Sequence, residues 1–187
     1  MCTDKEPIKP FDDPIIFSSF LKNDCELLSF SKGWIEYSIL THEFRAHKIN
    51  SITFSMEICS ECPNYNNNWK SDITFWINNV EVATYRSLGD YGGRRGNYTP
   101  QWWSFGSTQY GMLINLTINN DGTFINGEKV TNVTLKEINP TKFMDLKFKL
   151  GIKENARFAG GLNLFGKKFG DYNQGLSLII DYEVKDK

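Results

Sequence analysis

Apolar and polar residues alternate with a period of two along most of this chain. Ile52, Phe54, Met56 and Ile58, for example, are separated by single residues that are mostly polar. This period places one row of side chains in a core and the other row toward solvent, which is typical of a half-buried β-strand. Helical periodicity is almost absent. The predicted strands cover residues 28–30, 34–39, 49–58, 73–77, 80–84, 112–118, 123–125, 130–135, 144–152, 162–165 and 176–182.

Turn sequences separate these strands at nearly regular intervals. Asn78-Asn79 predicts a tight hairpin, and the Asn-Asn-Asp-Gly run at residues 119–122 predicts a second one. Residues 41–48 are expected to form a connector, and residues 136–141 a loop with one helical turn. Many short strands with so little helix predict an all-β domain. We expect a two-sheet antiparallel sandwich with jelly-roll-like wiring.

The first 26 residues differ from the rest of the chain. Residues 1–14 are polar and contain three prolines. Residues 15–20 are predicted to form a short edge strand, and residues 21–26 a turn of helix. We interpret residues 1–26 as a linker from a preceding domain. Residues 27–187 then form the sandwich, since this length suits a single domain.

Charge and hydropathy restrict the partners. The formal net charge is −1, so no global field attracts nucleic acid or an acidic membrane surface. No apolar run is long enough to span a bilayer, and the start lacks the basic and apolar regions of a signal peptide. We therefore expect a cytoplasmic protein without membrane contacts.

The four cysteines are expected to be reduced thiols. Cys59 and Cys62 have the spacing of a zinc or redox pair, but Cys2 and Cys25 stand alone and do not form the second pair that a zinc site needs. Residues 117–128 match several positions of a calcium-binding EF-hand loop, but the flanks are predicted strands, and a hairpin turn explains the same residues. We therefore predict neither a metal site nor a cofactor.

The sequence also lacks a catalytic signature. His42 and His47 are the only histidines, and no nucleophile motif accompanies them. A glycosidase needs two facing carboxylates, and the sequence singles out no such pair. We predict a protein that is not an enzyme, with glycoside hydrolysis as the alternative left open.

Residues 87–106 concentrate the chemistry of the chain. This stretch holds four glycines between residues 89 and 96, two adjacent arginines and two adjacent tryptophans. Glycines let a partner approach the main chain, arginines offer planar forks of donors, and tryptophans offer flat apolar faces. A loop this long and aromatic is more typical of binding than of a plain connection.

Carbohydrate is the ligand that these residue types favour. Sugars have apolar C–H faces and a rim of hydroxyls, so their sites combine an aromatic platform with convergent polar groups. We predict a site for a sugar or another small polar molecule, on a fold similar to carbohydrate-binding modules. Its predicted ligand-binding residues are Trp76, Asp90, Arg94, Arg95, Trp102, Trp103, Asn163, Asp171 and Asn173.

Several sequence blocks stand in a fixed order between residues 28 and 182: MEICS (56–60), YNNNWKSDITFWIN (65–78), GDYGGRRG (89–96), TPQWW (99–103), TQYG (108–111) and GGLNLFGKKFGDYNQ (160–174). Together they resemble the C-terminal region of a group of bacterial transcriptional regulators, in which an ArsR-like winged-helix domain precedes this region. The resemblance implies an effector or sensing domain, here without its DNA-binding head, so DNA is expected to be contacted only through that head. A homodimer is a further expectation.

Two other functions stay open. The chain would also suit an extracellular carbohydrate-binding module or a lipoprotein whose mature form begins at Cys2. It would equally suit a dimerisation domain without a ligand, whose aromatic residues face a partner chain.

Overall fold

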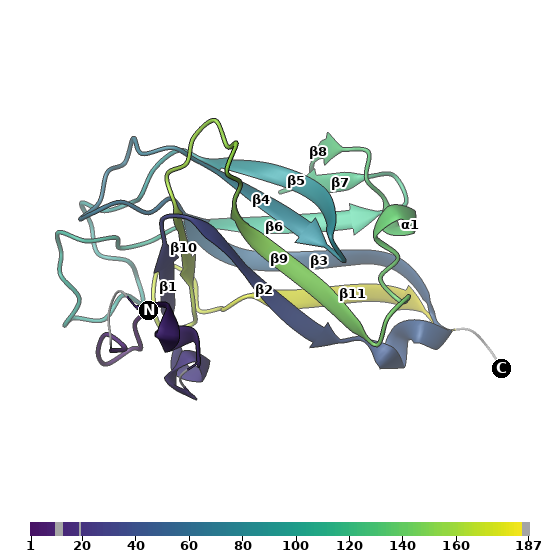
Figure 1. Cartoon of the computed structure of the whole chain (residues 1–187), viewed down its shortest axis with the longest axis horizontal. Coiled ribbons are helices and arrows are strands. Elements are labelled where there is room, and N and C mark those ends of the chain that lie inside the picture. The colour runs from purple at the N-terminus through teal and green to yellow at the C-terminus, as the bar shows by residue number, and fades with distance from the viewer. Residues whose placement is uncertain (10–12, 19, 185–187) are drawn as a thin grey trace.

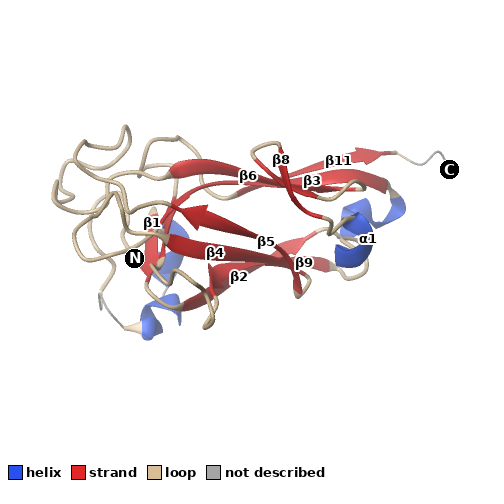
Figure 2. Cartoon of the chain, turned by 90° about the horizontal axis from the view of Figure 1, so that it is seen from above, coloured by secondary structure: helices blue, strands red, loops and turns tan. Residues whose placement is uncertain are grey.

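The fold is a sandwich of two antiparallel β-sheets. A computed structural model describes residues 1–9, 13–18 and 20–184. The strands among these residues form one seven-stranded and one four-stranded sheet, which pack face to face (Figure 1). Figure 2 shows the two layers edge-on, with irregular loops gathered at one end and the short helix α1 at the other. The predicted all-β sandwich is confirmed.

The larger sheet is built around its longest strand, β3. At 12 residues, β3 pairs with β10 near its C-terminal end and with β11 along the rest of its length. The strand order is β1 (Leu27–Phe30), β10 (Leu162–Phe165), β3 (Lys48–Cys59), β6 (Met112–Asn119), β7 (Thr123–Ile125) and β8 (Glu128–Thr131), with β11 (Ser177–Glu183) beside β3.

The smaller sheet has the order β2 (Gly33–Leu40), β9 (Asp145–Ile152), β4 (Ser71–Ile77) and β5 (Val80–Ser87). The hairpin between β4 and β5 turns at Asn78 and Asn79, whose φ angles are 49° and 68°. Asparagine tolerates this left-handed region better than most residues, so the predicted turn is confirmed.

The core lies between the sheets. Phe54 of β3 stacks on Phe148 of β9 with 3.9 Å between ring centroids, and Phe75 of β4 lies 6.2 Å from Phe148. All three rings are fully buried. Aromatic side chains from both inner faces thus interdigitate, which the period-two pattern of these strands predicts.

Two local predictions are wrong, and side-chain capping explains both. Residues 14–18 form a 3-10 helix, η1 (Pro14–Ser18), instead of a strand, because Asp13 Oδ1 accepts the Ile15 N–H at 2.9 Å. Residue 19 lies outside the described residues. The strand predicted at 130–135 ends at Thr131, because Thr134 and Glu137 form a capping box that begins α1 (Leu135–Ile138).

The N-terminal segment packs on the sandwich beside β1. The Cys2 N–H donates to the Leu27 carbonyl at 2.8 Å, and Met1, Cys2, Ile8 and Ile16 are buried. A second 3-10 helix, η2 (Phe20–Asp24), follows, where a helical turn was predicted, and a third, η3 (His42–Ala46), joins β2 to β3. That residues 1–26 link to a preceding domain stays a prediction. The described helices include none that is long and apolar enough to cross a membrane.

Candidate functional site

Three loops meet at one end of the sandwich, on the left in Figure 1. They are residues 60–70 after β3, residues 88–111 after β5 and residues 166–176 after β10. Backbone bridges join Asn66 to Asp90, and the Tyr98 N–H donates to the Gly170 carbonyl at 2.8 Å. The loops that were expected to share a site therefore do lie together.

A buried carboxylate on β3 holds two of these loops. Glu57 Oε1 accepts the N–H groups of Gly111 at 2.7 Å and Asp171 at 2.8 Å, and Oε2 accepts the Tyr172 N–H at 3.0 Å. Burial raises the pKa of Glu57, and the three N–H donors partly offset this effect. Glu57 is fully buried and was not predicted from the sequence.

Asp90, a predicted ligand-binding residue, is a second buried scaffold carboxylate. It is fully buried, and its Oδ2 accepts the Cys62 N–H and the Thr108 hydroxyl, both at 3.0 Å. Burial raises the pKa of Asp90 to about 6. Its oxygen atoms connect the loops and do not reach the surface, so the structure places Asp90 in the scaffold of the loops.

The raised pKa of Asp90 predicts a specific pH dependence. Because the pKa of Asp90 is raised in the folded state, the stability that the protonated group confers is present at low pH and is lost as the pH rises from about 4 through about 6. Asp90→Asn removes the titration, so from pH 4 to pH 7 the variant should gain about 2 kcal/mol of unfolding free energy relative to wild type. Urea unfolding of both proteins at several pH values measures this difference. A pH-independent difference would contradict the assignment.

Arg94 and Asp171 form an ion pair with each other. The guanidinium donates to the carboxylate in a bidentate pair, with 2.9 Å between Nη1 and Oδ1, and lies 3.6 Å above the Tyr110 ring. The Asn97 N–H also donates to Asp171, at 3.1 Å. The structure thus brings these two predicted residues together, but as a clamp between loops.

Arg95 also makes internal contacts. Its Nη1 donates to the carbonyls of Pro100 at 2.7 Å and Trp103 at 3.2 Å. Because these bonds stay within residues 95–103, Arg95 shapes its own loop. Asn173 is exposed on the neighbouring loop of residues 166–176.

The two adjacent tryptophans differ in their surroundings. Trp103 is half-buried, donates from Nε1 to the Thr108 carbonyl at 2.7 Å, and packs edge-on against Phe169. Trp102 remains 38% exposed and donates to the Asp4 carbonyl at 2.8 Å. Trp103 therefore packs inside the loop region, whereas Trp102 lies at the surface and contacts the N-terminal segment.

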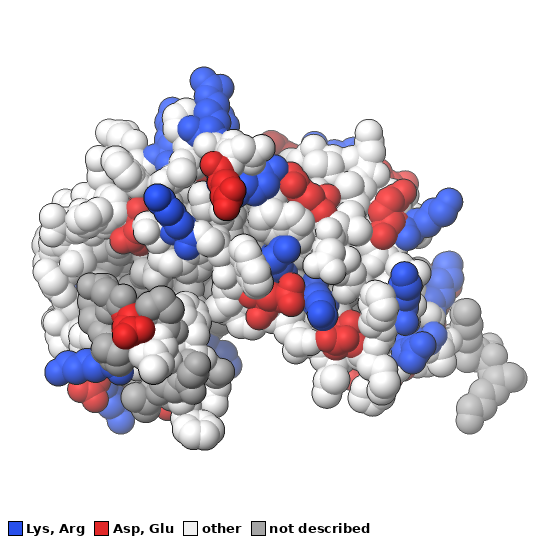
Figure 3. Space-filling model, in the orientation of Figure 1, with Lys and Arg blue, Asp and Glu red and all other residues white. Residues whose placement is uncertain are grey.

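Trp76 does not join the loops. It lies near the end of β4 that adjoins the Asn78-Asn79 turn, half-buried on the outer face of the smaller sheet, with Lys149 Nζ 4.9 Å from its ring. Figure 3 shows this face, where acidic and basic side chains are interspersed. Its assignment to the loop site was wrong, because Trp76 lies at the end of β4 opposite the end that the loop of residues 60–70 enters.

Two glycines of residues 87–106 let neighbouring loops of the same chain pack directly against the backbone. A Cβ at Gly92 would lie 2.3 Å from the Tyr65 ring, and a Cβ at Gly96 would lie 2.2 Å from the Gln109 carbonyl oxygen. The close approach predicted from these glycines is thus made by the protein itself.

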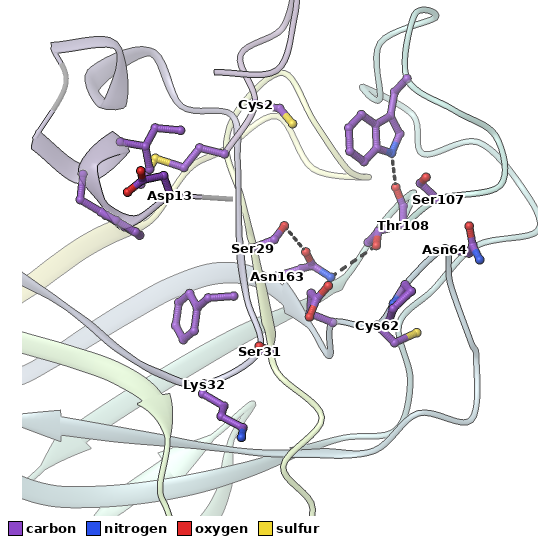
Figure 4. Close-up of a pocket in the computed structure, with 17 residues that line it drawn as sticks. Cys2, Asp13, Ser29, Ser31, Lys32, Cys62, Asn64, Ser107, Thr108 and Asn163 are labelled. Carbon is purple, nitrogen blue, oxygen red and sulfur yellow. Dashed lines mark hydrogen bonds between the residues drawn. The ribbon is translucent and has the colours of Figure 1, made fainter. Parts of the chain in front are cut away.

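A crevice of about 600 Å³ lies between the loops and the N-terminal segment (Figure 4). Trp103, Phe30 and Ile16 contribute apolar surface. Several polar side chains from three separate segments also line it: Ser29, Lys32, Glu61, Asn64, Ser107 and Thr108. This crevice is the candidate site, and it includes two of the predicted residues, Trp103 and Asn163.

Asn163 fixes polar groups at the wall of the crevice. Its Nδ2 donates to the Ser60 carbonyl at 2.7 Å and contacts Thr108 Oγ1 at 3.4 Å, while its Oδ1 accepts the Ser29 hydroxyl. Figure 4 shows the Ser29–Asn163–Thr108 chain of contacts. Asn163 is only 1% exposed, so it orients the two hydroxyls more than it offers atoms to a ligand.

Sequence reasoning missed most residues of this crevice. Ser29, Lys32, Asn64 and Ser107 are common surface types, and no local motif connects them. Only the meeting of β1, the loop after β3 and the loop after β5 brings them to one cavity.

The cysteines and histidines of the described residues do not form a metal-binding cluster. Cys59 and Cys62 are buried and unpaired, as is Cys2, while Cys25 is half-buried and unpaired. His47 packs against Tyr182 at the end away from the crevice, with ring centroids 5.0 Å apart. Across the described part of the chain, no three His, Cys, Asp or Glu side chains are grouped to hold a metal ion.

No protein-family model matches the chain, and no curated protein sequence matches it. Among solved structures, the chain is similar to a CBM36 carbohydrate-binding module in complex with calcium and xylotriose. The similarity covers 84% of this chain and 78% of that module, with 10% sequence identity and a TM-score of 0.32.

Proposed function

We propose that the crevice binds a small polar ligand, and that a carbohydrate of one or two rings suits it best. The observation that carries this proposal is the combination of an indole wall with polar side chains around about 600 Å³ of concave space. This volume lies in the ordinary range of small-molecule sites. The proposed role is binding without catalysis.

The lining groups match the surface of a sugar. Trp103 and Phe30 offer apolar area for C–H faces. Lys32 supplies ammonium donors, Glu61 carboxylate acceptors, and Asn64 both kinds of group. Because each sugar hydroxyl both donates and accepts, a mixed lining pairs with it more completely than a lining of one sign.

The crevice also suits a sensing role, because two parts of the chain enclose it. Met1, Cys2 and Ile16 of the N-terminal segment form one side, and Ser107 and the other loop residues form the opposite side. A ligand that contacts both sides would favour one position of the N-terminal segment. We propose that this segment leads to the winged-helix domain implied by the resemblance, in a cytoplasmic regulator.

Calorimetric titration with monosaccharides, disaccharides and sugar phosphates tests the binding proposal. Lys32→Ala should weaken binding about 10-fold or more, because a hydrogen bond from a charged donor is lost. Lys136→Ala, on α1 at the other end of the sandwich, is the matched control and should bind as wild type does. Silence across all these ligands would contradict the proposal, as would equal affinity for both variants.

The regulatory part of the proposal has a separate test. The nucleotide sequence upstream of the Met1 codon should encode a winged-helix domain in the same reading frame. A signal peptide or a lipoprotein cleavage motif there would instead favour an extracellular module and would overturn the cytoplasmic assignment.

A further inference from the structure

Two indoles flank a lysine on the outer face of the smaller sheet. Lys149 Nζ of β9 lies 5.2 Å from the Trp34 ring of β2 and 4.9 Å from the Trp76 ring of β4. Trp34 is 62% exposed, which is unusual for so large an aromatic side chain in a strand. The ammonium group thus lies between two ring faces.

The register of the sheet sets the spacing of the two indoles. Trp34 is opposite Gly151, and Gly151 is opposite Thr74, whereas Lys149 is opposite both Glu36 and Trp76. The two tryptophans are therefore two strands and two residues apart, which places their Cα atoms about 12 Å from each other. Gly151 has no side chain, and Trp34 packs closely over it, since a Cβ at Gly151 would lie 2.6 Å from Trp34 Cβ.

Charged groups of both signs surround these rings. Lys153 Nζ contacts Glu81 Oε1 at 2.8 Å across the sheet, and Glu36 is exposed beside Lys149. In Figure 3 this face shows acidic and basic side chains interspersed.

This composition favours a sugar chain as occupant. The core of a protein interface is depleted in charged residues, whereas here a lysine stands at the centre. Linked sugar rings present apolar faces at intervals and hydroxyls between them, which matches separated indoles with donors and acceptors in between.

We infer that this face is a second ligand site, which takes an extended oligosaccharide across β2, β9 and β4. Its rings stack on Trp34 and Trp76, and Lys149 donates to hydroxyls between them. This site is distinct from the crevice and does not depend on it.

Affinity electrophoresis of the full chain tests the inference, with soluble β-glucan, galactomannan and polygalacturonate as probes. Retardation by at least one glycan is expected, and Trp34→Ala and Trp76→Ala should each weaken it 10-fold or more. Trp34→Phe keeps a ring and should retain part of the affinity. Neutral and acidic glycans are tested separately. Tighter binding of the acidic glycan would show that the charge of Lys149 makes the larger contribution to affinity.

A matched variant shows where on the protein the glycan binds. Trp69→Ala removes a 43% exposed indole at the loop end and should leave glycan affinity unchanged. Thermal unfolding confirms that each variant is folded. The inference is overturned if no glycan retards the protein, or if Trp34→Ala and Trp76→Ala bind as wild type does. It is also overturned if these variants change the sedimentation coefficient, because the face is then an interface between proteins.

Discussion

Glu57→Ala is expected to lower the free energy of unfolding by about 3 to 5 kcal/mol. The substitution removes the acceptor of the Gly111, Asp171 and Tyr172 N–H groups, all in segments packed over β3. Buried donors without acceptors carry the full cost of their lost hydration. Urea unfolding followed by tryptophan fluorescence measures the change.

The effect should be local as well as large. Hydrogen exchange of Glu57→Ala should show faster exchange at residues 111 and 171–172, while β3 and β6 keep their relative protection. Glu128→Ala, an exposed glutamate of β8, is the control and should change stability by less than about 0.5 kcal/mol. Similar small effects for both variants would show that Glu57 does not organise the loops.

Trp103→Ala is expected to cost about 3 kcal/mol of stability, because a half-buried indole leaves a cavity next to Phe169. The Thr108 carbonyl also loses its donor, which lies 2.7 Å away. Differential scanning calorimetry measures the shift. The variant should also lose affinity for any crevice ligand, because Trp103 is one wall.

The neighbouring tryptophan provides the comparison. Trp102 is 38% exposed, so Trp102→Ala should cost less than about 1 kcal/mol and leave crevice binding unchanged. If the two substitutions were equally costly, the assignment of one indole to the interior and the other to the surface would be wrong.

The strands could be predicted from the sequence because their determinants are local. Ile52, Phe54, Met56 and Ile58 alternate and are all buried in β3, and an Asn-Asn pair forms the β4–β5 turn. The N-terminal segment was harder to predict, because a hydrogen bond from one side chain, Asp13, begins η1. A period of apolar residues does not reveal such a cap.

The site could be predicted only to the level of its loops. Arg94, Asp171 and Asp90 have the residue types of a sugar site, but their partners are other groups of the same chain. Glu57 and Asp171 are 114 residues apart, so no sequence pattern indicates that one accepts the N–H of the other. Residue type alone does not separate a scaffold group from a group that faces a ligand.

Trp34 shows a signal that was present in the sequence. It belongs to the alternating strand in which Ile35, Tyr37 and Ile39 point inward, so it occupies the outward row with Glu36. A tryptophan in the solvent row of a strand is unusual, and this alone would have marked the outer face of the smaller sheet.

The central claim is that the crevice holds a small polar ligand. Amide NMR of the full chain, titrated with the sugar that binds best in calorimetry, tests it most directly. If the ligand occupies the crevice, chemical shifts should change most at residues 29–32, 64 and 107–108, together with Cys2 and Ile16 of the N-terminal segment. Changes confined to residues 94–98 and 171–173, or no changes with any sugar, would contradict it.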